Sequence, residues 1–210
     1  MNPSTKIRLL LVDDHFIMRL GLVTAINQEP EVAVVGQCGS GEQAIELFRQ
    51  HRPDVTVMDL RLPGISGIEA TATIRENCPE ARIVLFSNYE TEEDVFRAKE
   101  AGAVAYLAKS SDPTELLAAV RVVHSGGTYF PEAIAAKLAA RGARPPLTDR
   151  EVDILRLIVL GRCNKEIAKE LRIAANTVRN HVSNLMEKLG VADRTGAATA
   201  AIQRGIIRLE

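Results

Sequence analysis

The sequence predicts an α/β protein in which a doubly wound, five-stranded parallel sheet is followed by a second, smaller domain made only of helices. Over residues 1–125, short apolar runs alternate five times with segments of helical periodicity, and from Leu147 onward no strand pattern appears. Alternation of this kind favours parallel strands, because short right-handed crossovers leave few other topologies.

Four of the apolar runs stop at polar residues. The run over residues 54–60, DVTVMDL, is too short for a helix and precedes a Pro63-Gly64 turn, so we expect a buried strand with Asp59 at its C-terminal end. Because the carboxyl ends of parallel strands share one crevice, we expect the polar residues to meet there. The runs over 7–12, 83–86 and 104–108 stop at Asp13-Asp14, Ser87 and Lys109.

Each strand is followed by apolar residues at three- and four-residue spacing, which predicts helices over 16–28, 41–51, 67–77, 91–101 and 113–124. Gly126-Gly127 ends the last of these, and a short Ala-rich helix runs from Pro131 to about Ala140. The next segment, RGARPP over residues 141–146, contains Gly, two Pro and no large apolar side chain. We therefore expect a hinge there.

The remaining residues predict a helix-turn-helix. Thr148 and Glu151 form a capping box at the start of a helix that Gly161 closes, and Asn164 is expected to cap a second helix over 165–172. After a tight turn, a third helix runs over 176–189, and Asp193 starts a last one rich in alanine. The buried stripe of the third helix is expected to be Val178, Val182, Leu185 and Leu189.

Composition narrows the class of protein. Hydrophobic residues make up 46% of the chain and charged residues 25%, as in ordinary globular proteins. No charge-free stretch exceeds 10 residues and MNPSTK has no apolar region behind it, so we expect neither a membrane span nor a secretory signal. Three scattered cysteines argue against a disulfide framework and a metal cluster. We expect a cytoplasmic protein.

The net charge of −1 hides an asymmetry between the two parts of the chain. Residues 1–125 carry 12 Lys and Arg against 18 Asp and Glu, whereas residues 126–210 carry 14 against 9. This difference indicates two domains with different partners, and phosphates are a natural partner for the basic one.

The polar residues at the strand ends form a densely negative, oxygen-rich site. Mg²⁺ suits such a site, since it takes one or two carboxylates and keeps room for phosphate oxygens. With the repulsion relieved, Asp59 is a carboxylate nucleophile that can attack phosphorus, while Lys109 and the Ser87 hydroxyl hold the acyl phosphate. The sequence therefore predicts an aspartate that is phosphorylated.

At this point a family resemblance is clear. Residues 5–125 resemble the receiver domain of bacterial two-component response regulators, including the sequence LPGISGIEA that follows the phosphoacceptor position. The resemblance implies a flavodoxin-like sheet of order 2-1-3-4-5, phosphoryl transfer from a sensor histidine kinase, and a switch formed by Ser87 and Tyr106. It also implies a Mg²⁺ ion held by Asp13, Asp14, Asp59 and the main-chain carbonyl of Arg61.

Residues 147–197 are similar to the LuxR-type helix-turn-helix of NarL/FixJ response regulators, including LTDRE, NKEIA, TVRNHV and KLGV. We take 147–210 as the DNA-binding domain and 126–146 as a linker with a short helix. Arginine suits guanine and asparagine suits adenine, while lysines neutralise phosphates. The expected DNA contacts are Lys165, Asn176, Thr177, Arg179, Asn180, His181, Ser183 and Lys188.

Three positions depart from the family patterns. Asn88 stands beside the switch hydroxyl, where a small residue is usual, and Ser110 stands where many receivers have a proline in a cis peptide. We expect a trans bond before Ser110, because a cis bond without proline costs about 3 kcal/mol. Ala174 replaces a capping serine, at a cost of about 1 kcal/mol, unless Asn176 or Thr177 caps a helix that starts two residues later.

We therefore expect a DNA-binding response regulator, and not an enzyme, that forms a homodimer on phosphorylation or on DNA. One alternative is a phosphatase that works through an aspartyl phosphate, although such enzymes usually carry DxD on one strand, whereas Asp14 and Asp59 lie on different strands. Another alternative is a transcriptional regulator that works independently of phosphorylation, through protein contacts alone.

Overall fold

The computed structural model describes residues 6–208, which divide into two compact units. The first unit comprises the residues up to 90 together with 95–136, and the second comprises 91–94 together with the residues from 137 onward. Each unit has its own hydrophobic core. Within the described residues, no helix combines the length and the apolar character that crossing a membrane requires.

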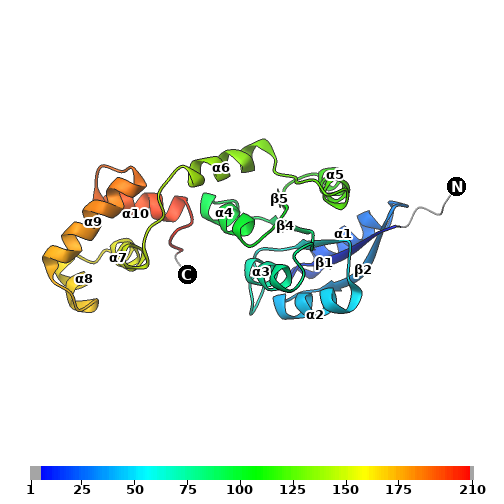
Figure 1. Cartoon of the computed structure of the whole chain (residues 1–210), viewed down its shortest axis with the longest axis horizontal. Helices are drawn as coiled ribbons and strands as arrows, with labels where there is room; N and C mark the ends of the chain where they lie inside the picture. Colours follow the sequence, from blue (N-terminus) through cyan, green and yellow to red (C-terminus); the bar gives the residue numbers. More distant parts are fainter. Residues whose placement is uncertain (1–5, 209–210) are drawn as a thin grey trace. The chain divides into compact units, whose positions relative to one another are not determined.

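The first unit is built on a parallel sheet of five strands (Figure 1). The strand order β2-β1-β3-β4-β5 confirms the flavodoxin-like order predicted from the sequence. The third strand is central and every one of its residues is buried, so its C-terminal end opens at the middle of one sheet edge. The strands are β1 (Ile7–Val12), β2 (Val32–Cys38), β3 (Val55–Met58), β4 (Ile83–Ser87) and β5 (Ala105–Ala108).

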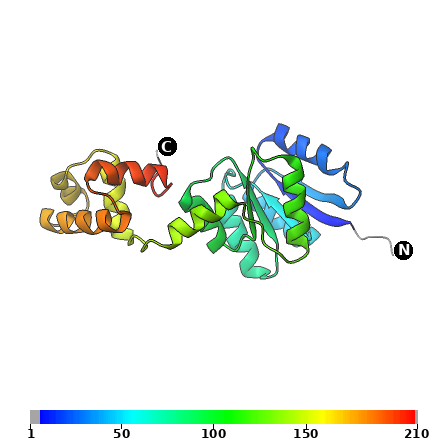
Figure 2. The ribbon, with the colours of Figure 1, turned by 90° about the horizontal axis from the view of Figure 1, so that it is seen from above.

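Helices cover both faces of this sheet (Figures 1 and 2). On one face, α1 (Phe16–Ile26) and α5 (Pro113–His124) pack on the strands in a shared core. On the other face lie α2 (Gly41–His51) and α3 (Gly67–Asn77), which contact each other. These four helices follow the predicted ranges, except that α1 ends two residues earlier.

The fourth helix is also shorter than predicted, since α4 spans Glu92–Glu100 rather than 91–101. Thr91 lies outside the helix because its hydroxyl caps it: Oγ1 accepts a hydrogen bond of 3.2 Å from the main-chain N–H of Asp94. The Lys109–Ser110 peptide bond is trans, as expected.

The C-terminal residues are helical, as predicted. The helix α6 (Glu132–Gly142) continues two residues past the expected end near Ala140, because the first proline comes only at Pro145 and the N–H of Ala143 still bonds to Ala139. The irregular segment therefore begins after Gly142 rather than at residue 141. The other helices are α7 (Asp149–Val159), α8 (Asn164–Glu170), α9 (Ala175–Leu189) and α10 (Arg194–Gln203).

Two helix starts differ from the sequence prediction. The prediction that Asn164 caps α8 is wrong, because the capping position is Cys163. The N–H of Cys163 donates to the carboxylate of Glu166 at 2.7 Å, and Glu166 stands three residues after the cap, as in a capping box. The helix α9 begins directly after Ala174, which has no side-chain cap. The later start, with Asn176 or Thr177 as a cap, is therefore not adopted.

Gly67 fixes the loop between β3 and α3. A Cβ atom at Gly67 would lie 1.9 Å from the carbonyl oxygen of Asp59, where no real Cβ contact is found. The N–H of Gly67 donates to the carbonyl of Leu60 at 3.0 Å, which closes the loop tightly. Only glycine allows the start of α3 to approach the end of β3 so closely.

We expect the substitution Gly67→Ala to destabilise the first unit by about 1–3 kcal/mol, because the overpacked methyl group must displace main-chain atoms. Urea unfolding followed by tyrosine fluorescence reports this unit alone, since Tyr89, Tyr106 and Tyr129 all belong to it.

Gly21→Ala is the matched control for Gly67→Ala. Gly21 lies inside α1, and beyond its chain neighbours and the backbone of its own helix no atom lies within 4 Å of the position that an added methyl group would take, so alanine should stabilise the helix by about 0.5–1 kcal/mol. Equal unfolding midpoints for the two variants would contradict the proposed role of Gly67.

Candidate functional site

The polar residues predicted to meet at the strand ends do so. Asp13 follows β1, Asp59 follows β3, Ser87 ends β4 and Lys109 follows β5. Main-chain hydrogen bonds hold these ends in register: the N–H of Asp59 donates to Val12 at 2.8 Å, and the N–H of Lys109 donates to Ser87 at 3.0 Å. The parallel sheet thus brings four positions that are far apart in the sequence to one edge.

An ion pair of three side chains forms the centre of this site. The Nζ atom of Lys109 lies 2.7 Å from Oδ2 of Asp59 and 2.7 Å from Oδ2 of Asp13. All three side chains are buried, with exposed fractions of 2–3%. Removing one partner would leave a buried charge without compensation, which costs far more than an exposed pair contributes.

The environment shifts the pKa values of these groups. Burial raises the pKa of Asp59, and the hydrogen bond and charge of Lys109 only partly offset this. Burial alone would lower the pKa of Lys109, but the carboxylates of Asp13 and Asp59 outweigh it, so its pKa is raised. Lys109 is therefore firmly cationic, and its ammonium opposes the effect of burial on the pKa of Asp59.

The acidic cluster has the composition of a divalent-cation site. One ligand atom from each of Asp13, Asp14, His15 and Asp59 lies within 4.8 Å of the others. Oδ2 of Asp13 is buried, and among the described residues it makes an ion pair with Lys109 but no properly aligned hydrogen bond. Asp14 is half-exposed and pairs with His15 across 2.7 Å. Clustered carboxylate oxygens of this kind fit a hard cation such as Mg²⁺.

The two predicted switch residues both engage the main chain of Tyr89. Tyr106 is fully buried, and its hydroxyl donates a hydrogen bond to the carbonyl oxygen of Tyr89. The hydroxyl of Ser87 accepts a hydrogen bond of 3.2 Å from the N–H of Tyr89. Burial, together with the charges of Glu90 and Asp59, raises the pKa of Tyr106 well above its usual value, so the phenol stays protonated and able to donate.

Sequence reasoning missed the side chains of Arg61 and Tyr89. It gave Arg61 only a main-chain role, yet the guanidinium lies over the Tyr89 ring, 4.3 Å from its centroid. An arginine two residues after one strand-end aspartate and an aromatic residue two residues after the strand-end serine were the available signal. Periodicity says nothing about loop side chains, so the contact required the fold.

The second predicted site is the exposed face of α9. Asn176, Thr177, Arg179, Asn180 and Ser183 are exposed, whereas Val178, Leu185 and Leu189 are buried. The predicted stripe is therefore confirmed, with Val182 partly buried. The guanidinium of Arg179 donates to the Asn176 side chain at 2.8 Å, so these two polar groups form one unit near the start of the helix. Lys165 on α8 is exposed as well.

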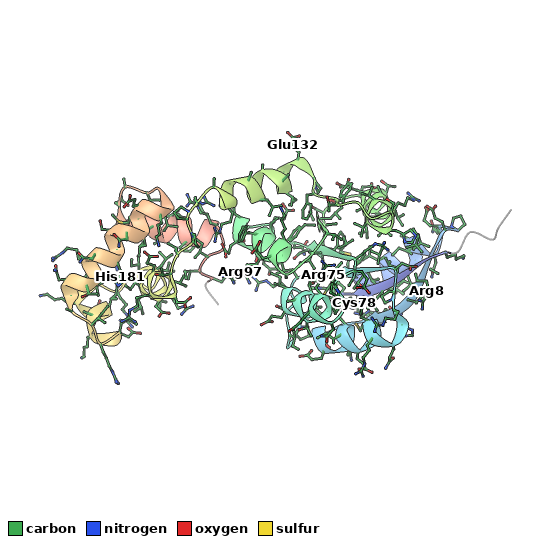
Figure 3. The ribbon with its side chains drawn as sticks, in the orientation of Figure 1. Arg8, Arg75, Cys78, Arg97, Glu132 and His181 are labelled. Carbon is green, nitrogen blue, oxygen red and sulfur yellow. The ribbon has the colours of Figure 1, made fainter. Side chains whose placement is uncertain are left out.

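Two of the residues expected to contact DNA, His181 and Lys188, are only partly exposed on α9. Lys188 donates to the Glu151 carboxylate at 2.7 Å and to the carbonyl of Pro146 at 3.2 Å. His181, labelled in Figure 3, is half-buried and lines the same hollow beside the start of α7 as Lys188 and Thr148. The ammonium of Lys188 thus ties α9 to α7, a structural contact that the sequence pattern did not reveal.

Comparisons with known proteins identify a family for each part of the chain. The response regulator receiver domain family matches residues 9–121, and the family of bacterial regulatory proteins of the luxR type matches residues 145–201. The transcriptional regulatory protein LiaR of Bacillus subtilis is 36% identical, over 96% of this chain and 99% of LiaR.

Solved structures show the same relationship. A crystal structure of a LuxR-family two-component response regulator from Aurantimonas sp. SI85-9A1 is 40% identical, covers 66% of this chain and 99% of its own, and has a TM-score of 0.62. The RcsB response regulator of Salmonella typhimurium, 24% identical over 92% of this chain and 98% of its own, shares the fold with a TM-score of 0.74.

The fold, the sites and these matches define a regulator that joins a receiver domain to a LuxR-type helix-turn-helix domain. The chain belongs to the two-component response regulators of the NarL/FixJ type, the family that includes LiaR.

The contact between Glu151 and Lys188 predicts a pH-dependent stability. Burial would raise the pKa of Glu151, but hydrogen bonds from Lys188 and from the N–H and hydroxyl of Thr148 outweigh it and lower that pKa. A lowered pKa stabilises the fold fully above the usual value of 4.5, and this contribution is lost progressively as the pH falls from that value through the lowered pKa. We expect Glu151→Gln to cost about 1–3 kcal/mol at pH 7 and progressively less as the pH falls below 4.5.

Amide hydrogen exchange of peptides from α7 and α9 measures this stability locally. Glu187→Gln is the matched control, since Glu187 is an exposed carboxylate on α9. A loss of protection in the Glu151→Gln variant that is the same at pH 7 and at a pH well below 4.5 would show that the ionised pair contributes nothing.

Proposed function

We propose that this protein accepts a phosphoryl group on Asp59 from a sensor histidine kinase and, in response, regulates transcription by binding double-stranded DNA through α9. The observation that carries the proposal is the buried ammonium of Lys109 between Asp59 and Asp13. An ammonium group at this place stabilises Asp59 when a phosphoryl group adds negative charge to it. A site with only a structural role would gain no stability from burying three charges.

Asp13, Asp14, Asp59 and the main-chain carbonyl of Arg61 would hold Mg²⁺, which supplies charge neutralisation for the phosphoryl oxygens. An Asp59 carboxylate oxygen attacks phosphorus, the bond from phosphorus to the donor's leaving group breaks, and an acyl phosphate forms. Lys109, now paired with Oδ2 of Asp59, then pairs with a phosphoryl oxygen. The protein is in this view an acceptor in a single transfer and not an enzyme with turnover.

The acyl phosphate offers a new hydrogen-bond acceptor to Ser87. If the Ser87 hydroxyl turns toward it, the hydrogen bond from the Tyr89 N–H is lost, and the loop that Tyr106 also holds is released to move. We propose this exchange of partners as the switch, with the surface of α4 and α5 responding and a homodimer as the result. A dimer would grip two DNA half-sites about one helical turn apart.

On the DNA side, the exposed groups of α9 are suited to base edges, and the surrounding lysines to phosphates. We propose Arg179, Asn180 and their exposed neighbours as base contacts and Lys165 as a phosphate contact. We propose further that residues 5–125 act as the receiver, 126–146 as the linker and 147–210 as the DNA-binding domain. The kinase and the DNA as partners would place the protein in the cytoplasm.

We expect the substitution Asp59→Asn to abolish phosphorylation by a small acyl phosphate in the presence of Mg²⁺, because the amide is not a nucleophile at phosphorus. Intact-protein mass spectrometry measures the added phosphoryl group. Glu76→Gln, which neutralises an exposed carboxylate on α3, should leave the reaction unchanged.

Further measurements on the same proteins separate the alternatives. An Asp59→Asn variant with unchanged DNA affinity and oligomeric state would indicate a regulator that does not depend on phosphorylation. Repeated turnover of a small phosphoester by the unaltered chain would indicate a phosphatase.

We expect Arg179→Ala to weaken binding to DNA selected from a random pool by about 1–3 kcal/mol, and to relax the preference at one base position. Fluorescence anisotropy with the selected duplex and with base-substituted duplexes measures both effects. Arg156→Ala removes an exposed arginine of α7 that pairs with Asp153 and is the control with the same charge change. Equal losses for the two variants would show that only net charge matters.

A further inference from the structure

The first turn of α2 lies against the loop that joins β3 to α3. Glu42 is the second residue of α2, and its Oε1 atom accepts a hydrogen bond of 3.0 Å from the main-chain N–H of Ile65. The carbonyl group of Ile65 is approached as closely, since a Cβ atom at Gly41 would lie 2.2 Å from its oxygen. Consecutive residues of one helix therefore meet both main-chain polar groups of Ile65.

The carboxylate of Glu42 also lies close to Gly64. The φ angle of Gly64 is +71°, and a Cβ atom there would lie 2.3 Å from Oε1 of Glu42. Glycine thus lets the main chain of the loop close onto the carboxylate. Hydrogen bonds from the main-chain N–H groups of Glu42 itself and of Ile65 lower the pKa of Glu42, and the Ser40 hydroxyl adds to this. Glu42 is therefore an ionised acceptor at neutral pH.

The loop carries the main-chain carbonyl of Arg61, one of the groups proposed to hold Mg²⁺. At one end of the loop, the N–H of Arg61 donates to Oδ1 of Asp59 at 3.2 Å. At the other end, the N–H of Gly67 donates back to the start of the loop at 3.0 Å. Between these two ends, the hydrogen bond from Ile65 to Glu42 fastens the loop to a different helix. Glu42 thus limits where this part of the main chain can lie.

The same end of α2 is adjacent to the acidic pair. Gly39 lies in the turn before α2, and its N–H donates to the Gln43 side chain at 3.4 Å. A Cβ atom at Gly39 would lie 3.6 Å from the carbonyl oxygen of Asp13 and from Cα of Asp14. The start of α2 therefore lies beside both main-chain segments of the proposed cation site, the one with Asp13 and Asp14 and the one with Arg61. Groups that orient the ligands of a metal ion have a large effect on its affinity.

From this geometry we propose that Glu42 is a positioning residue, which sets the affinity for Mg²⁺ by holding the loop between β3 and α3 at Ile65. The inference rests on the proposed function, because it concerns the cation that would support phosphorylation of Asp59. Glu42 contributes no ligand atom in this view, since its carboxylate is engaged by the main chain of the loop.

The test is the Mg²⁺ affinity of the full-length chain, measured by isothermal titration calorimetry. We expect Glu42→Ala to weaken Mg²⁺ binding about tenfold, because the loop loses its hydrogen bond to α2. Glu42→Gln removes the charge but keeps a carbonyl oxygen that can accept from Ile65, so it should restore the affinity to within about twofold of the unaltered chain. Glu42→Asp keeps the charge but withdraws the acceptor by one methylene group, and should bind Mg²⁺ as weakly as Glu42→Ala.

Glu46→Ala is the matched control. Glu46 is an exposed carboxylate one turn further along α2, where it accepts hydrogen bonds from Arg49 and Gln50. This variant should keep the Mg²⁺ affinity of the unaltered chain. Amide hydrogen exchange without Mg²⁺ gives a second readout, because protection of the Ile65 N–H should fall in Glu42→Ala and not in Glu46→Ala.

The outcomes distinguish this inference from the proposed function. If the unaltered chain binds no Mg²⁺, the proposed function and the positioning role fail together. If it binds Mg²⁺ and Glu42→Ala keeps its affinity, the positioning role is refuted while the cation site stands. A Glu42→Gln variant as weak as Glu42→Ala would assign the effect to charge and would refute the role as well. If Glu42→Ala does not fold, the comparison of Glu42→Asp with Glu42→Gln decides.

Discussion

The ion pair of Lys109 with Asp59 and Asp13 is the interaction on which the receiver unit depends. Three buried charges are tolerable only if they compensate one another, so the ends of β1, β3 and β5 must stay within reach of one ammonium group. Because β4 lies between β3 and β5 and ends in the small Ser87, the lysine side chain can reach across the end of that strand. The strand order and the ion pair therefore both require the ends of β1, β3 and β5 to lie close together.

That constraint also explains why the loops around the site are so closely determined. Gly67 lets the start of α3 approach the carbonyl of Asp59, and the main-chain N–H groups of Arg61 and Tyr89 reach the Asp59 carboxylate and the Ser87 hydroxyl. A change at any strand end is felt in these loops, because they share hydrogen bonds with the strand-end side chains. The phosphorylation proposed at Asp59 would thus act on a connected set of contacts, which is what a switch requires.

The helix-turn-helix unit also contains a buried carboxylate that is paired with a lysine. Glu151 is buried, caps the start of α7 and receives the ammonium of Lys188 from α9. One carboxylate thereby satisfies a main-chain N–H at the start of α7 and holds α9 against that helix. In the first half of α9, Arg179 and Asn180 are exposed, and Arg179 bonds to Asn176 of the same helix.

Much of this was decided by the sequence alone. Apolar periodicity determined the order and nature of the elements, and residues such as Asp59 and Lys109 followed from their place at the ends of apolar runs, because the two-residue and 3.6-residue repeats depend only on local geometry. Tertiary structure decided what local rules cannot see: that Lys188 faces Glu151 and that Arg61 stacks on Tyr89. Those contacts join side chains from separate elements, and their partners are set only when the elements pack together.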